Sequence, residues 1–366
     1  MLKDLFLRII RFSLWGSDNN LQVGALEHKD FNKLTKIATE QAVMGLLSQG
    51  LIDANVRLER EDALNLFALQ QSIRRQNNVI DQAVVSLCKE MTGRNIKIFV
   101  FKGQPLARSY SDAGLRQSGD IDFFCFPEDW QNAIQYFKEE LKLPLNDLYT
   151  EKDVEFQMNR VAYEMHCKLT LFSNPWHGRY WEKNVMPEII SHLEEVDINS
   201  CSVPTLSPTY NVLYVFTHIY QHLISDGIGL RQFCDLAVLI HRFRDNIDVE
   251  LLEKHLKGIG MKKAFLYCGA LLTDSLGLSE DVFPFKIPEK FHRKQKMLLD
   301  NIFEMGNFGR NLRYKNRPGI SHGIEHLGRI ARQSMKFGQY APSEAYFKIP
   351  YMFKWWAMKI SRMVRK

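Results

Sequence analysis

Two aspartates one residue apart, Asp120 and Asp122, interrupt an apolar run that includes Ile121 and Phe123. An ionised carboxylate is costly to remove from water unless a cation or another partner compensates its charge. Residues i and i+2 of a β-strand point to the same side, so we expect both carboxylates on one face. Such oxygen pairs suit Mg²⁺, which takes further oxygens from phosphate groups. The pair predicts a magnesium site, with Mn²⁺ as a substitute; the alternative is a solvated pair at a strand end.

A later segment, VAYEMHCKL, carries a similar pattern. Glu164 and His166 would share one face of a strand, with Met165 on the other. If this strand pairs near the one that carries Asp122, Glu164 becomes a third carboxylate that could bind metal or accept a proton from an attacking hydroxyl. The alternatives are a Glu–Lys cross-strand pair for Glu164 and a satisfied buried histidine for His166, in place of a contact with the acceptor.

Positive charge is expected beside these carboxylates. Lys102 and Gly103 end the apolar run IKIFVF and lead into a short helix at about 104–110. Glycine permits close backbone approach, a helix N-terminus attracts phosphate, and the lysine adds a full charge. Arg116 is a second candidate phosphate ligand. The alternative for Lys102 is a solvated residue at a strand end.

The elements that position these residues alternate between strands and helices. IKIFVF, DIDFFCF, VEFQM and VAYEM have the length and composition of strands, and a turn is expected at Asn159-Arg160. The stretch EDWQNAIQYFKEEL reads as a helix that follows a proline and has acidic residues in its first turn. This βαβαββ order indicates a small mixed sheet with helices against it.

The flanks of this core have apolar residues at the three- and four-residue spacing typical of helices. We therefore expect an α+β protein with three parts. These parts are an N-terminal helical region at 1–92, the core at 93–205, and a C-terminal helical domain at 206–366.

Composition fits a globular protein with room for a sizeable core. The chain has 366 residues, of which 45% are hydrophobic, and its six cysteines show no metal-binding spacing, which indicates a reducing compartment. No apolar stretch approaches the roughly 18 residues of a membrane span, so a cytoplasmic location is expected by default. The net charge is +6. Residues 310–366 hold 13 lysines and arginines against two acidic residues, a balance of +11, which leaves −5 for the rest.

The ordered motifs resemble a known family. The chain is similar to the bacterial uncharacterised nucleotidyltransferases of the DNA polymerase β-like superfamily, whose pattern resembles F-K-G-x-x-L-A-x-x-Y, then L-R-x-x-G-D-I-D, then E-x-H. The usual Gly-Ser after the first strand of the superfamily is Lys-Gly here. The matching residues are Phe101-Lys102-Gly103, Leu106-Ala107, Tyr110, Leu115-Arg116, Gly119-Asp120-Ile121-Asp122 and Glu164-Met165-His166.

This resemblance implies a polymerase β-like nucleotidyltransferase core and transfer of a nucleoside monophosphate from an NTP to a hydroxyl or phosphate acceptor, with release of pyrophosphate. It implies catalysis and metal binding by Asp120, Asp122 and Glu164. Lys102, Gly103, Arg116 and Gly119 would bind the nucleotide. The alternative is a nucleotide-binding or regulatory protein that keeps the fold without turnover.

The acceptor and other partners are less defined by the sequence. His218, Arg231 and Asp235, with His166, are candidates for the acceptor side, although His218-His222 and Arg231-Asp235 are also typical of polar contacts between helices. The acceptor is a small molecule or a protein, as in nucleotidyltransferase antitoxins that transfer AMP to a partner. No nucleic-acid template is expected. The basic amphipathic stretch YMFKWWAMKISRMVRK favours docking on its own domain over peripheral membrane contact.

Overall fold

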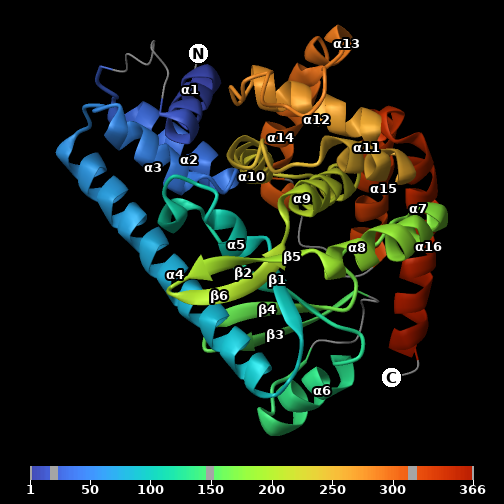
Figure 1. Cartoon of the computed structure of the whole chain (residues 1–366). Coiled ribbons are helices and arrows are strands. Elements are labelled where there is room, and N and C mark those ends of the chain that lie inside the picture. The colour runs from blue at the N-terminus through green and yellow to red at the C-terminus, as the bar shows by residue number, and fades with distance from the viewer. Residues whose placement is uncertain (1, 17–23, 146–151, 312–319, 365–366) are drawn as a thin grey trace. The chain divides into compact units, whose positions relative to one another are not determined.

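The computed structural model describes residues 2–16, 24–145, 152–311 and 320–364, and the side chains of these ranges apart from 320–324 and 354–364 (Figure 1). The chain forms two compact units. Unit 1 comprises residues 1–169 and 192–207, and unit 2 comprises residues 170–191 and 208–366. The three-part division expected from the sequence stays a prediction.

Unit 1 begins with four helices and continues into two sheets. The longest helix, α4, has acidic residues in its first turn, as the helix dipole favours, and buries one stripe of side chains along its length. The helices are α1 (Leu2–Trp15), α2 (His28–Glu40), α3 (Met44–Asp53), α4 (Arg60–Gly93), α5 (Gly103–Ala107), the 3-10 turn η1 (Ala113–Leu115), α6 (Trp130–Gln135) and η2 (Tyr136–Glu140).

The central sheet of unit 1 has four strands in the order β1-β2-β4-β3. Strand β2 pairs antiparallel with β1 and parallel with β4, and β4 pairs antiparallel with β3, so the sheet is mixed as the sequence predicts. The turn between β3 and β4 lies at Asn159-Arg160, where both residues have positive φ, as in a type I′ hairpin. The strands are β1 (Ile98–Phe101), β2 (Asp120–Cys125), β3 (Asp153–Met158) and β4 (Val161–His166).

The two faces of this sheet differ in character. One face packs against α4 in a hydrophobic core. Ile121 and Phe123 of β2 and Met165 of β4 belong to that core, so strand alternation places Asp122 and Glu164 on the opposite face. Core members from α4 are Ile80, Val84, Leu87, Cys88 and Met91. The predicted division of the strand residues between the two faces is therefore present in the fold.

A second, two-stranded sheet was not predicted from the sequence. Strands β5 (Leu193–Ile198) and β6 (Cys201–Leu206) pair antiparallel around Asn199-Ser200, both with positive φ. Ile198 and Val203 join the core beneath the central sheet. Three of the six positions of the segment LEEVDI are exposed and acidic, which hides its strand character from pattern reading.

Unit 2 is helical throughout its described elements. Its helix α9 is buried on almost every side, with Tyr214, Phe216 and Tyr220 in its interior. The helices are α7 (Pro175–Tyr180), η3 (Trp181–Val185), α8 (Met186–Ser191), α9 (Pro208–Leu223), α10 (Leu230–Arg242), α11 (Val249–Gly258), α12 (Lys262–Asp274), α13 (Glu289–His292), α14 (Gln295–Met305), η4 (Asn307–Gly309), α15 (Ile320–Phe337), η5 (Gly338–Tyr340) and α16 (Pro342–Val364).

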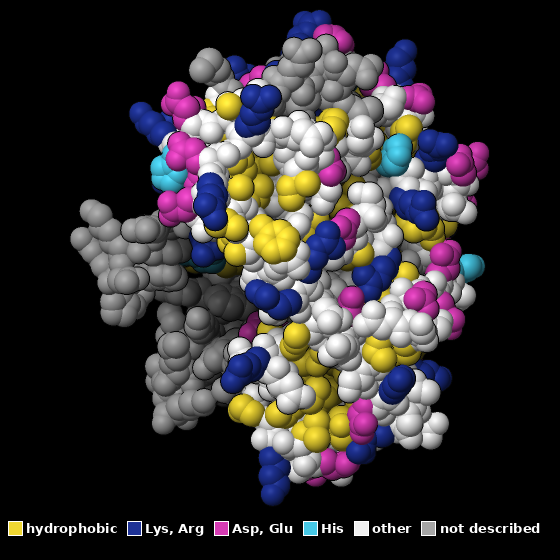
Figure 2. Space-filling view, turned by 90° about the vertical axis from the view of Figure 1, so that its left-hand side faces the viewer, with side chains coloured by type: hydrophobic (Ala, Val, Ile, Leu, Met, Phe, Trp, Pro, Cys, Tyr) yellow, Lys and Arg dark blue, Asp and Glu magenta, His cyan; other side chains and the backbone are white. Residues whose placement is uncertain are grey.

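In the part of the chain that the structure describes, no helix is both long and apolar enough to cross a membrane. Figure 2 views the side on which α4 lies, where apolar side chains emerge among charged ones. Exposed apolar residues of α3 and α4 include Ile52, Leu64 and Phe67. From residue 354 onward, the side chains of the amphipathic stretch expected near the C-terminus lie outside the described residues. The two small sheets and the surrounding helices confirm the predicted α+β fold class.

Candidate active site

The carboxylates of β2 and β4 meet on the face of the sheet away from α4. Asp122 is the register partner of Glu164 in the parallel β2–β4 ladder, so the two side chains lie next to each other on one face. Carboxylate oxygens of Asp122 and Glu164 and a ring nitrogen of His166 all lie within 4.8 Å of one another. The strand that carries Glu164 therefore pairs directly with the strand that carries Asp122, as the predicted role of Glu164 requires.

His166 lies between the two carboxylates. Its Nε2 is 3.0 Å from Asp122 Oδ1 and 3.4 Å from Glu164 Oε2, while Nδ1 is 3.7 Å from Asp153 Oδ2. The ring is fully buried and packs edge-on against Phe101, with 5.0 Å between ring centroids. Side chains of the neighbouring strands thus fix the orientation of the imidazole, and the ring forms one cluster with the two carboxylates.

Lys102 forms an ion pair with Asp122, with 2.9 Å between Nζ and Oδ1. Burial alone would raise the pKa of Asp122, but the ion pair with Lys102 and the hydrogen bond with His166 outweigh this effect and hold the pKa well below its usual range. The backbone of Lys102 has φ 57° and ψ −140°, a conformation natural for glycine and strained for lysine. The chain therefore keeps a lysine aimed at Asp122 where a glycine would be unstrained.

The other predicted nucleotide-binding residues surround the start of β2. Gly103 has φ +34°, and a side chain there would contact the backbone oxygen of Asp120. The Arg116 guanidinium is buried and donates to the Ser118 hydroxyl at 2.9 Å. Gly119 faces open space. Asp120 begins β2 on the same face as Asp122 but is not part of the close group of ligand atoms, so its metal-binding role stays a prediction.

The predicted acceptor-side residues other than His166 lie in unit 2. His218 on α9 stacks edge-on with His222, with 4.5 Å between ring centroids, and His222 contacts Phe308 at 4.8 Å. Arg231 and Asp235 lie on α10, where Asp235 is buried. Their role toward an acceptor stays a prediction.

Sequence reasoning missed two acidic residues of β3. Asp153 is the register partner of His166, and Glu155 is the partner of Glu164, so both lie on the face that carries Asp122. The hairpin register contained this signal, because antiparallel partners are equidistant from the turn at 159–160. Three adjacent strands thus direct acidic side chains to one face of the sheet.

The donor set suits a divalent cation. Asp122 and Glu164 supply oxygen ligands, and the side chain of Glu164 is 29% exposed, so this edge of the group reaches water. The Asp122 side chain is only 4% exposed and its charge is already compensated by Lys102, so a cation that binds there must displace the ammonium. The two carboxylates suit Mg²⁺ or Mn²⁺, whereas the ring nitrogen of His166 is a ligand that transition-metal ions take more readily than Mg²⁺ does.

A small mixed sheet that presents carboxylates from neighbouring strands beside a lysine is consistent with the nucleotidyltransferase class, which the family match below shows. The chain belongs to the family described as uncharacterised nucleotidyltransferase, whose sequence profile matches residues 27–277. A solved structure of an antigenic nucleotidyltransferase-like protein from Paracoccidioides brasiliensis is similar at 13% identity and a TM-score of 0.33, over 56% of this chain and 95% of that one. No curated protein matches the chain.

Proposed function

We propose that this nucleotidyltransferase moves a nucleoside monophosphate from an NTP to a hydroxyl or phosphate acceptor in a divalent-cation-dependent reaction. The observation that carries the proposal is the convergence of Asp122, Glu164 and His166 on one face of the sheet, in a chain of this family. Lys102 supplies positive charge at the same point.

In the proposed reaction the acceptor oxygen forms a bond to the α-phosphorus, the bond from that phosphorus to the bridging oxygen breaks, and pyrophosphate leaves. A bound Mg²⁺ supplies neutralisation of the triphosphate charge and orientation of its oxygens. Asp122 and Glu164, with Asp120, would hold the cation. Glu164, the more exposed carboxylate, is also proposed to take the proton from an acceptor hydroxyl.

Lys102 is proposed to exchange partners during binding. Without substrate its ammonium neutralises Asp122. With a cation held by Asp122, the Lys102 ammonium would be free to contact phosphate oxygens, where its charge would stabilise the developing pyrophosphate. Gly103 leaves the adjoining backbone accessible, and Arg116 is a second proposed phosphate ligand.

Calorimetry with each of the four NTPs, with and without Mg²⁺, tests binding, and pyrophosphate release tests turnover. Asp122→Asn and Glu164→Gln should abolish Mg²⁺-dependent binding and release. Glu128→Gln is the matched control, because Glu128 is exposed and pairs with Lys97 away from the group. The metal-site proposal fails if the wild-type chain binds no NTP, or if Asp122→Asn binds it as the wild type does.

A second candidate, nucleotide binding without turnover, is favoured by the buried Lys102–Asp122 pair, which opposes cation entry. Incubation of the chain with α-labelled NTP and a cell extract separates the possibilities. Label on a protein indicates a protein acceptor, and label on a low-mass product indicates a small-molecule acceptor. Tight Mg²⁺–NTP binding with no labelled product in any fraction supports the non-catalytic function.

A further inference from the structure

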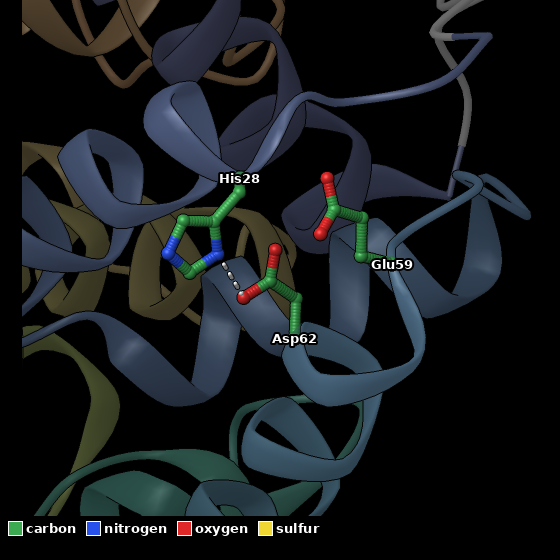
Figure 3. A group of neighbouring side chains, drawn as sticks. All are labelled: His28, Glu59 and Asp62. Carbon is green, nitrogen blue, oxygen red and sulfur yellow. Dashed lines mark hydrogen bonds and ion pairs between the residues drawn. The ribbon is translucent and has the colours of Figure 1, made fainter.

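A second group of metal-ligating side chains lies in unit 1, at the joint between α2 and α4. His28 is the first residue of α2, Glu59 occupies the N-cap position of α4 without a side-chain capping bond, and Asp62 lies in the first turn of α4. One ligand atom from each lies within 4.8 Å of the other two. Figure 3 shows the imidazole and both carboxylates pointing toward one another.

Asp62 is the residue that needs an explanation. It is fully buried, and its Oδ1 bonds to His28 Nδ1 at 2.8 Å. Its Oδ2 is buried and has no hydrogen-bond partner among the described residues. A buried carboxylate oxygen without a partner is destabilising, and in Figure 3 this carboxylate faces Glu59, whose like charge adds no compensation. A cation between the two carboxylates would satisfy both.

Backbone hydrogen bonds, which do not involve the three side chains, join the segments that precede α2 and α4. An isolated parallel bridge joins Ala25 to Arg57, with hydrogen bonds of 3.0 Å and 3.1 Å on either side. This bridge fixes the start of α2 beside the start of α4. The ligand atoms therefore come from the first turns of two helices whose backbones are held together. Binding of a metal ion then costs little conformational entropy.

We propose that His28, Glu59 and Asp62 bind a divalent transition-metal ion, with Zn²⁺ as the best fit. Zinc takes nitrogen and carboxylate oxygen ligands in four-coordinate sites, whereas Mg²⁺ prefers an all-oxygen shell. Two carboxylates and a neutral imidazole balance the charge of the ion. His28 and Glu59 are exposed, which leaves the fourth position open to water. The ion cross-links α2 to α4 at a site separate from the carboxylates of β2 and β4.

Asn32 provides the outer contact that such a site requires. Its amide lies 2.8 Å from His28 Nε2, on the side of the ring away from Asp62. A metal ion on Nδ1 leaves the proton on Nε2, and the Asn32 amide, turned to present its oxygen, would accept it. Metal-bound histidines commonly have a fixed acceptor of this kind on the second nitrogen.

Zinc binding to the full chain by calorimetry, in the presence of excess Mg²⁺, tests the proposal. Wild type should bind one tight equivalent that Mg²⁺ does not displace. Glu59→Gln and His28→Gln should raise the Kd for that equivalent by at least about tenfold. Both residues are exposed, so these variants fold even if Asp62→Asn, which alters a buried side chain, does not.

Two matched controls separate this site from the other His and carboxylate groups. Glu164→Gln acts at the candidate active site, and Glu280→Gln acts at the Asp274, Glu280 and His292 group in unit 2. Neither should change the tight equivalent. The proposal is overturned if the wild-type chain binds no zinc tightly, if Glu59→Gln and His28→Gln both bind it as the wild type does, or if Glu164→Gln removes the tight equivalent.

Discussion

At the scale of single residues, the candidate active site depends on the pairing of Lys102 with Asp122. We expect Lys102→Met to lower the free energy of unfolding by about 3 kcal/mol in buffer without divalent cations, because among the described residues the buried carboxylate then keeps only His166 as a partner. Mg²⁺ or Mn²⁺ should then restore part of that loss. Thermal melting with and without millimolar cation measures both effects.

The cation effect distinguishes metal binding from a purely structural ion pair. Lys97→Met is the matched control, because Lys97 is 68% exposed in its side chain and pairs only loosely with Glu128. That variant should stay within about 0.5 kcal/mol of wild type. If Mg²⁺ and Mn²⁺ raise the melting temperature of Lys102→Met no more than that of the wild type, Asp122 does not bind the cation.

The backbone at the same residue allows a second test. Lys102→Ala and Lys102→Gly both remove the ammonium, but only alanine keeps a side chain in the strained conformation at φ 57°. We expect the alanine variant to be less stable than the glycine variant by about 1 kcal/mol, after the greater freedom of glycine in the unfolded chain is included. Urea denaturation of the two variants side by side gives the difference. Equal stability would mean that position 102 holds no backbone strain.

At the scale of elements, strand alternation carried most of what the sequence could predict. The spacing of Asp122 and Ile121 assigns one residue to each face, and the same rule assigns Glu164 and Met165. Each pattern is local and needs only the period of a strand. The mixed sheet, its βαβαββ order and the turn at 159–160 follow from such local signals.

The remaining features depend on contacts that local patterns do not encode. Strand β5 has few buried positions, and its pairing with β6 gives it a regular structure. Asp153 joins the site through register with His166, and nothing in its own neighbourhood indicates this. The positive φ of Lys102 arises from its place between β1 and α5, where tertiary contacts override the preference of lysine.

In unit 2, Glu344 joins three helices through one buried carboxylate. It lies in the first turn of α16 and accepts from the backbone N–H groups of Ser173 and Asn174, which precede α7. Its oxygens also contact His177 of α7 and Gln221 of α9, each at 3.1 Å. Burial would raise the pKa of Glu344, but these bonds outweigh it and hold the pKa below its usual value.

A depressed pKa makes this contribution pH-dependent. The carboxylate stabilises the folded chain fully above its unfolded pKa of about 4.3, and the contribution is lost as pH falls through the lower folded value. We expect Glu344→Gln to cost about 2–3 kcal/mol at pH 7. The difference from wild type should shrink below about pH 4. Denaturant titrations at several pH values measure it, and a difference that does not change with pH would contradict the assignment.

At the scale of the whole molecule, the six cysteines are distributed over both units and can be used to probe the folding of each. Cys88 and Cys125 are buried in unit 1, and burial raises the pKa of each thiol to about 12. Cys234 and Cys268 are buried in unit 2, and burial likewise raises the pKa of each. Cys167 and Cys201 are partly exposed. Reactivity requires an accessible thiolate, so the four buried thiols should be inert while both units stay folded.

This distribution predicts two classes of thiol. With a chromogenic disulfide reagent at pH 8, we expect at most two equivalents to react quickly in the native chain and all six to react in denaturant, because unfolding returns each pKa to about 8.5. The double variant Cys167→Ser/Cys201→Ser should lose the fast phase. At intermediate denaturant concentrations, thiol reactivity of the double variant distinguishes the two units, because the unit that unfolds first exposes its own two thiols. Rapid reaction of the four remaining thiols in the native double variant would show that the cores of the two units are not packed as described.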